Sequence, residues 1–174
     1  MKTFVLMVLA AATCFAAEQK KKDAYDIRPD AAKPADAPAS EKWQQDNKDK
    51  LAEATKPEAL AAFVKDGASA DALLAKVKTD YGTEPLDAFV VAAVTQYVMA
   101  PGACADARKI WTNALLKRAE GAAEDFVTQF CFDQLRWCAC PSQAAKIEAI
   151  AAKRGSKALK DFAAMIAREL AAAK

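Results

Sequence analysis

The residues of this chain best suited to chemistry are its cysteines, because histidine is absent. The sequence has 174 residues, with 5 Cys and no His. Without an imidazole, neither a Ser-His-Asp nor a Cys-His nucleophilic centre can be built, and a metal site would need thiolates and carboxylates. Cys138 and Cys140 form the closest pair, in the run Cys-Ala-Cys-Pro. Such a pair could be redox-active or could bind a soft metal together with other thiols.

A structural role for these thiols is favoured over a chemical one. A Cys-x-Cys at the end of a helix lacks the N-terminal setting that lowers a thiol pKa, and four thiolates on two helices fit tetrahedral zinc awkwardly. Thiol redox chemistry or soft-metal binding through Cys138 and Cys140 is therefore kept as the alternative hypothesis. We expect no catalytic residue, no metal and no cofactor.

The N-terminal segment has the pattern of an export signal. Lys2 precedes an apolar run that extends to Ala17, and small residues stand where a signal peptidase would cleave. We expect a signal peptide over residues 1–16, cleaved after Ala16, and a periplasmic or secreted mature chain. The apolar run is shorter than the roughly 20 residues that a membrane-spanning helix needs, so no transmembrane segment is expected.

Residues 17–39 are expected to form a disordered linker. They combine charges, alanines and three prolines, and their bulky apolar side chains are Tyr25 and Ile27. Such a segment cannot bury enough apolar surface to order itself.

A disulfide is expected between two of the four cysteines that remain after the signal peptide is removed. Cys131 and Cys138 are about two helical turns apart, or roughly 10 Å along one axis, which is too far for a disulfide. Cys104 and Cys138 are equally far in sequence from Gly121, so an antiparallel hairpin turning there would bring them together. We predict a Cys104–Cys138 disulfide, with Cys140 as the fallback partner of Cys104. Closing this loop would stabilise the fold by roughly 4 kcal/mol.

In the rest of the chain, glycine and serine occur at positions typical of helix ends. The glycines follow or separate the apolar-periodic runs, and each serine precedes one, where its hydroxyl can cap a first turn. Residues 40–174 are therefore expected to form one all-α domain of antiparallel helical hairpins. The expected helices cover Glu41–Ala54, Pro57–Lys65, Ala70–Tyr81, Pro85–Met99, Cys104–Ala119, Ala122–Ala139, Gln143–Arg154 and Lys157–Ala172.

A weak internal repeat indicates how these hairpins are arranged. The pattern Gly-[Thr/Ser]-x-x-Leu-x-x-Phe occurs at residues 82–89 and 155–162, and hairpins begin near Ser69, Cys104 and Ser142, at intervals of about 35 to 38 residues. In architecture, residues 69–174 resemble HEAT-type or tetratricopeptide-type helical repeats. The resemblance implies a scaffold that binds a macromolecule along a concave face. A compact helical bundle with the same hairpins is the alternative.

Polar and aromatic residues within the expected helices are assigned to the core. Asp133 and Gln134 interrupt the most aromatic helix, where a buried carboxylate would need a partner such as Arg136. Trp111, Tyr97 and Trp137 could line a groove, but large aromatics at helical spacing are more often core residues; we expect core positions for these three.

The charge balance limits the class of partner. Lys and Arg total 25 against 23 Asp and Glu, and the two signs are interspersed, which argues against a nucleic-acid partner. The sequence therefore predicts an exported, non-enzymatic interaction or scaffold module, whose partner is an unknown protein or envelope component.

Overall fold

The computed structural model describes residues 43–78 and 84–172, and the secondary structure of these residues is helical, with no strand. The expected all-α fold is confirmed. The expected signal peptide and linker lie outside the described residues. The elements are α3 (Lys48–Ala54), α4 (Pro57–Phe63), α5 (Gly67–Leu74), α6 (Pro85–Met99), α7 (Ala105–Gly121), α8 (Asp125–Cys138), the short 3-10 helix η2 (Pro141–Gln143), α9 (Ala144–Arg154) and α10 (Lys157–Ala172).

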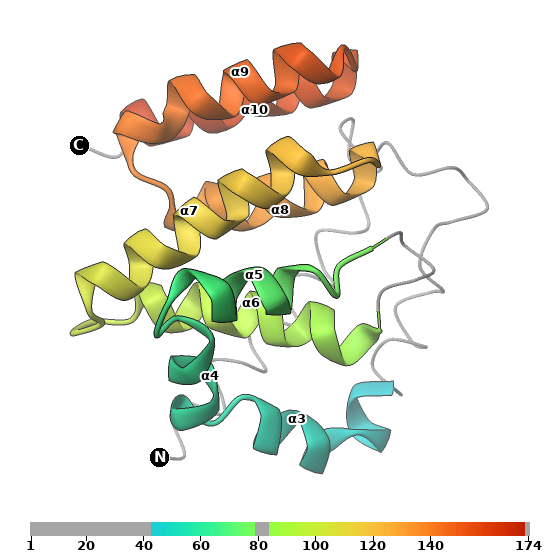
Figure 1. The fold of residues 1–174 in the computed structure, drawn as a ribbon, viewed down its shortest axis with the longest axis vertical. Helices are drawn as coiled ribbons and strands as arrows, with labels where there is room; N and C mark the ends of the chain where they lie inside the picture. Colours follow the sequence, from blue (N-terminus) through green and yellow to red (C-terminus); the bar gives the residue numbers. More distant parts are fainter. Residues whose placement is uncertain (1–42, 79–83, 173–174) are drawn as a thin grey trace.

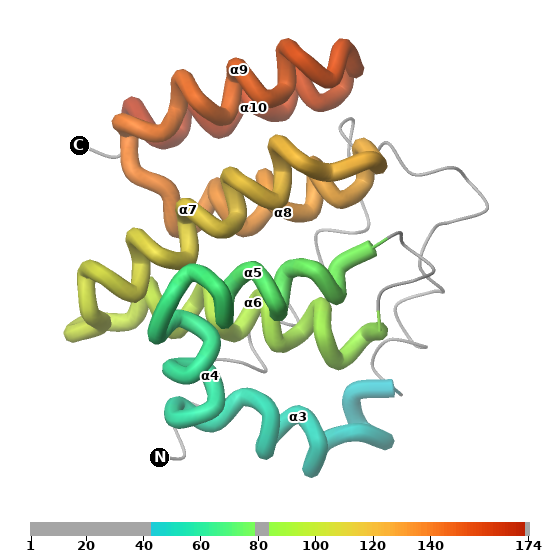
Figure 2. The backbone as a smooth tube through the Cα atoms, in the orientation of Figure 1, coloured from blue at the N-terminus to red at the C-terminus, as the bar shows by residue number. Residues whose placement is uncertain are grey.

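The helices stack as antiparallel hairpins in two layers (Figure 1). In one layer α7 packs between α5 and α9, and in the other α8 packs between α6 and α10. The helices of one layer run opposite to those of the other, so α6, α8 and α10 all end on the same side of the stack. Figure 2 shows the order, with α3 and α4 at the base and α9 and α10 at the opposite end.

The apolar pattern of each helix follows its place in this stack. α10 covers one end and buries a single stripe, whereas α6 lies inside and packs on α3, α4, α5, α7 and α8. The buried residues of α10 recur at the three- and four-residue spacing of one helical face: Leu159, Phe162, Ala163, Ile166 and Leu170. α6 is therefore a central helix of the stack.

Several helix boundaries differ from those expected. α5 begins at Gly67, because the carboxylate of Asp66 caps it by accepting a 2.7 Å hydrogen bond from the Ser69 amide; this hydrogen bond lowers the pKa of Asp66. Ser69 is therefore not the cap. Gly121 is the last residue of α7 rather than the turn, and α8 begins at Asp125. By contrast, Gly155 has a φ of 79° and ends α9 in the left-handed conformation that glycine adopts without strain.

Arginine side chains form hydrogen bonds with backbone carbonyl groups near the ends of neighbouring helices. The guanidinium of Arg154, at the end of α9, donates to the carbonyl oxygens of Ala122 and Ala123 beyond α7 and also contacts Asp125. Arg118 of α7 donates in the same way to the carbonyl oxygen of Val77. Carbonyl groups at the end of a helix lack partners within it, so these arginines supply the missing donors.

Candidate functional site

The four cysteines of the described residues are free thiols in this structure and differ in burial. Cys104 and Cys140 are exposed, whereas Cys131 and Cys138 are buried. Burial raises the pKa of Cys131 and of Cys138 to about 12, and the Cys138 thiol donates a hydrogen bond to the carbonyl oxygen of Gln134. A buried thiol with such a pKa stays protonated near neutral pH and is a poor nucleophile. This environment gives no support to redox chemistry at Cys138.

The helical hairpin that contains these cysteines has a register different from the expected one. Arg108 donates from Nε to the carbonyl oxygen of Cys138 (2.7 Å) and from Nη2 to that of Ala139 (3.1 Å). The side chain of α7 that contacts the Cys138 backbone is therefore that of Arg108, one helical turn beyond Cys104. The expected symmetry about Gly121 was wrong because the chain turns after Gly121, between α7 and α8. The Cys104–Cys138 disulfide, with Cys140 as fallback, stays a prediction.

The polar pair expected in the core is divided between two environments. Gln134 is buried, whereas Asp133 is half-buried. Arg136, the expected partner of Asp133, binds the carboxylate of Glu169 on α10 through Nε and Nη2, at 2.7 and 3.0 Å. The Arg136–Glu169 contact joins α8 to α10.

The three large aromatic residues expected in the core also differ in burial. Trp111 is fully buried and donates from Nε1 to the hydroxyl of Thr95 at 2.9 Å, which confirms its core position. Tyr97 is half-buried against the core. Trp137 is 60% exposed, so its expected core position is wrong. The physical reason is that the buried face of α8 contains its neighbours Cys138, Leu135 and Gln134.

An aromatic stripe occupies the outer face of α8. We use this name for Phe126, Phe130 and Trp137, which recur with Asp133 at spacings of four, three and four residues. This spacing places them on one side of a helix, opposite the residues that α8 buries. Phe126 and Phe130 are half-buried and contact each other with ring centroids 6.4 Å apart. The sequence alone contained the signal for this stripe, but α8 is also aromatic on its buried face, at Phe132.

Trp137 is held in place although it is exposed. The guanidinium carbon of Arg136 lies 5.5 Å from the centroid of the Trp137 ring, a cation–π arrangement. Glu169 binds the same guanidinium through two hydrogen bonds, which favour this position of the cation. The exposed indole is thus supported by this cation.

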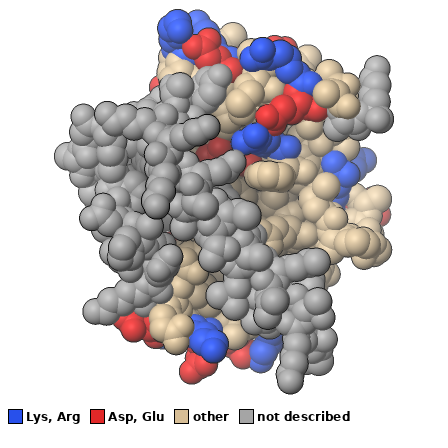
Figure 3. Space-filling view, turned by 180° about the vertical axis from the view of Figure 1, so that it is seen from behind, with Lys and Arg blue, Asp and Glu red and all other residues tan. Residues whose placement is uncertain are grey.

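Met99 provides a second exposed apolar side chain at the same end of the stack. It is 41% exposed and is the last residue of α6, which runs beside α8 in the same direction. Figure 3 views the molecule from behind, and its right-hand side shows mostly uncharged surface together with some charged groups. That side corresponds to the end of the stack where α6 and α8 finish.

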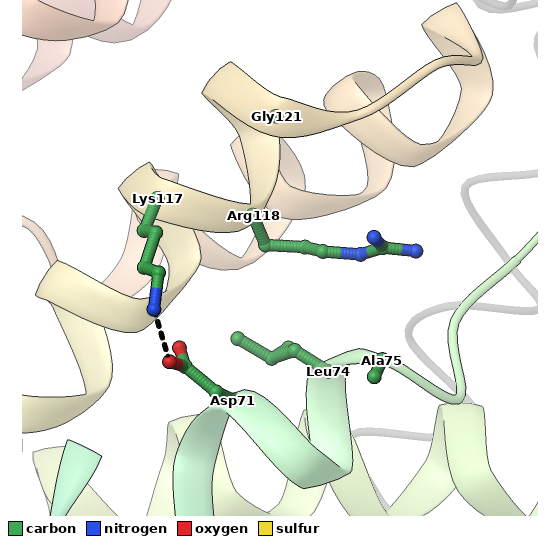
Figure 4. Close-up of a pocket in the computed structure, with 6 residues that line it drawn as sticks. All are labelled: Asp71, Leu74, Ala75, Lys117, Arg118 and Gly121. Carbon is green, nitrogen blue, oxygen red and sulfur yellow. Dashed lines mark hydrogen bonds and ion pairs between the residues drawn. The ribbon is translucent and has the colours of Figure 1, made fainter. Parts of the chain in front are cut away.

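A small cavity of about 210 Å³ lies between α5 and α7 (Figure 4). Lys117 and Asp71 face each other across it and form an ion pair, and the Arg118 side chain extends over Leu74. Both charged groups of the ion pair are used in joining the two helices. The cavity therefore resembles a gap between packed helices more than a ligand site.

Two other kinds of feature are absent from the described residues. Residues 43–78 and 84–172 contain no cluster of three or more His, Cys, Asp or Glu side chains that could hold a metal ion. In the same residues, no helix is both long enough and apolar enough to cross a membrane. Comparisons with protein-family models, with curated proteins and with solved structures found no match to this chain.

Proposed function

We propose that this protein is an exported, non-enzymatic interaction module that binds a protein or another envelope component at the end of the stack where α6 and α8 finish. The observation that carries the proposal is the exposure of Trp137, at 60%, on a helix that has ample buried positions for an indole. Tryptophan is among the residues most enriched at the energetic centres of protein interfaces.

The geometry around Trp137 fits such a role. Arg136 and Glu169 fix the environment of the ring before any partner arrives, so little side-chain freedom would be lost on binding. Met99 is a second exposed apolar side chain, at the end of the neighbouring helix α6. The partner expected here has an apolar contact surface that covers the indole, rather than a strongly charged one.

The test is photo-crosslinking from the proposed surface in the full chain. A benzophenone amino acid replaces Trp137 in one variant and Asn113, an exposed residue of α7 in the other layer, in the matched control. We expect one macromolecule to be cross-linked reproducibly from position 137 and not from position 113. Its binding to the unlabelled chain should weaken by about tenfold or more in Trp137→Ala, as for a typical hot-spot residue, and stay unchanged in Asn113→Ala.

Equal cross-linking from both positions, or unchanged binding by Trp137→Ala, would contradict the proposed surface. Export is tested separately, by fractionating cells that produce the full chain and determining the N-terminal residue of the mature protein. Retention of residues 1–16 in the cytoplasm would contradict that part of the proposal.

A further inference from the structure

The first half of the aromatic stripe, Phe126 and Phe130, is half-buried: both rings pack against the edge of the core and remain partly uncovered. Phe126 and Phe130 lie on the face of α8 opposite its buried residues, and neither is at the end of the stack where Trp137 lies. Aromatic rings placed side by side on an outer face commonly mark a docking site. We propose that residues 17–42 of this same chain dock on Phe126 and Phe130, as a contact independent of the proposed partner site.

The position at which the described chain begins supports this occupant. Trp43 is the first described residue, and its ring stacks on that of Phe89, with centroids 5.5 Å apart and planes 2° apart. Phe89 belongs to the N-terminal part of α6, as Phe126 does in α8, and the two helices run side by side in one direction. Residues 17–42 therefore join the fold at the end of the stack where Phe126 lies.

The length and composition of the segment also fit. From Ile27 to Trp43 the chain can extend at most about 50 Å, whereas α8 is only about 20 Å long. The bulky apolar side chains of residues 17–39 are Tyr25 and Ile27, and the same stretch contains Pro29, Pro34 and Pro38. Proline-containing extended segments dock on aromatic surfaces at low entropic cost.

Cleavage of the native full chain by the aspartate-directed protease Asp-N, before Asp30 and Asp36, tests this contact. Cleavage tracks the undocked population when docking is fast, so we expect Tyr25→Ser/Ile27→Ser to accelerate it by about tenfold. Phe126→Ser/Phe130→Ser should accelerate it to a similar extent, and combining all four substitutions should add little. Ala31→Ser/Ala32→Ser, in the same segment, should leave the rate unchanged.

Equal rates in the wild-type chain and in Tyr25→Ser/Ile27→Ser would overturn the proposal. A rate that depends on protein concentration would also overturn it, since a second copy would then be the occupant. Because Phe126→Ser/Phe130→Ser could disturb α8, a benzophenone amino acid at position 130 gives an independent measurement, in which an intrachain cross-link to residues 17–42 is expected and an interchain one contradicts the proposal. Trp137→Ala should leave the cleavage rate unchanged, so failure of the proposed function is distinguishable from failure of this contact.

Discussion

The guanidinium of Arg108, in the first turn of α7, donates a 2.7 Å hydrogen bond to the carbonyl oxygen of Cys138, the last residue of α8. A second hydrogen bond reaches the carbonyl oxygen of Ala139. The contact fixes the register of the α7–α8 hairpin, because one side chain reaches across to the end of the facing helix. It also supplies hydrogen-bond donors to carbonyl groups that have no partner within the helix, because they lie at its C-terminal end.

Replacing Arg108 with Met should lower the free energy of unfolding by about 1–3 kcal/mol, because two partly buried carbonyl groups lose a charged donor while the aliphatic stem is retained. Urea titration followed by circular dichroism measures the change. Lys109→Met, at the exposed neighbouring position, is the matched control and should stay within about 0.5 kcal/mol of the wild type. Equal effects of the two substitutions would show that the Arg108 contact does not stabilise the hairpin.

Thr95→Val should destabilise the core by about 1–3 kcal/mol, since the buried Nε1–H of Trp111 would lose its acceptor while the volume of the side chain is nearly preserved. Thr112→Val is the control: its buried hydroxyl donates within its own helix, to the carbonyl oxygen of Lys109, and no buried donor is orphaned by its loss. Thermal unfolding of both variants compares them. A larger loss in Thr112→Val would be evidence against a hydrogen-bonded Trp111.

Thiol labelling without reductant should separate the cysteines into two classes. Cys104 and Cys140 are exposed and should react rapidly in the native protein, whereas Cys131 and Cys138 should react only after unfolding. Mass spectrometry of labelled peptides identifies each site. If Cys104 and Cys138 instead react only after reduction, the disulfide predicted from the sequence is formed in the mature protein.

The buried thiols should also make stability depend on alkaline pH. The pKa of Cys131 is raised by burial to about 12 from 9.0, so above about pH 9 the unfolded chain loses a proton that the folded chain keeps. The contribution is fully present below pH 9 and is lost as the pH rises toward 12. Cys131→Ala should therefore reduce the fall in unfolding free energy between pH 8 and about 10.5. Cys104→Ala, at an exposed thiol, should show the wild-type dependence of unfolding free energy on pH in the same urea titrations. If all three proteins show the same dependence, protonation of Cys131 is not coupled to folding.

Local patterns in the sequence determined the helices and most of their ends. Gly155 marks a helix end because the left-handed conformation there favours glycine, and the spacing of Leu159 and Phe162 identifies the buried stripe of α10. Absence of histidine determined which catalytic centres cannot be built. These conclusions depend on residue type and on spacings of a few positions along the chain, so they required no tertiary information.

Which face of α8 is buried was decided by the tertiary structure. α8 carries apolar side chains on all its faces, so its sequence is compatible with burial of either the Phe130 side or the Phe132 side. Packing of α8 against α6, α7 and α10 buries Phe132 completely. That choice leaves Trp137 exposed. The register of the α7–α8 hairpin was decided in the same way, since glycine can either extend a helix or end it, and in the folded chain Gly121 is the last residue of α7.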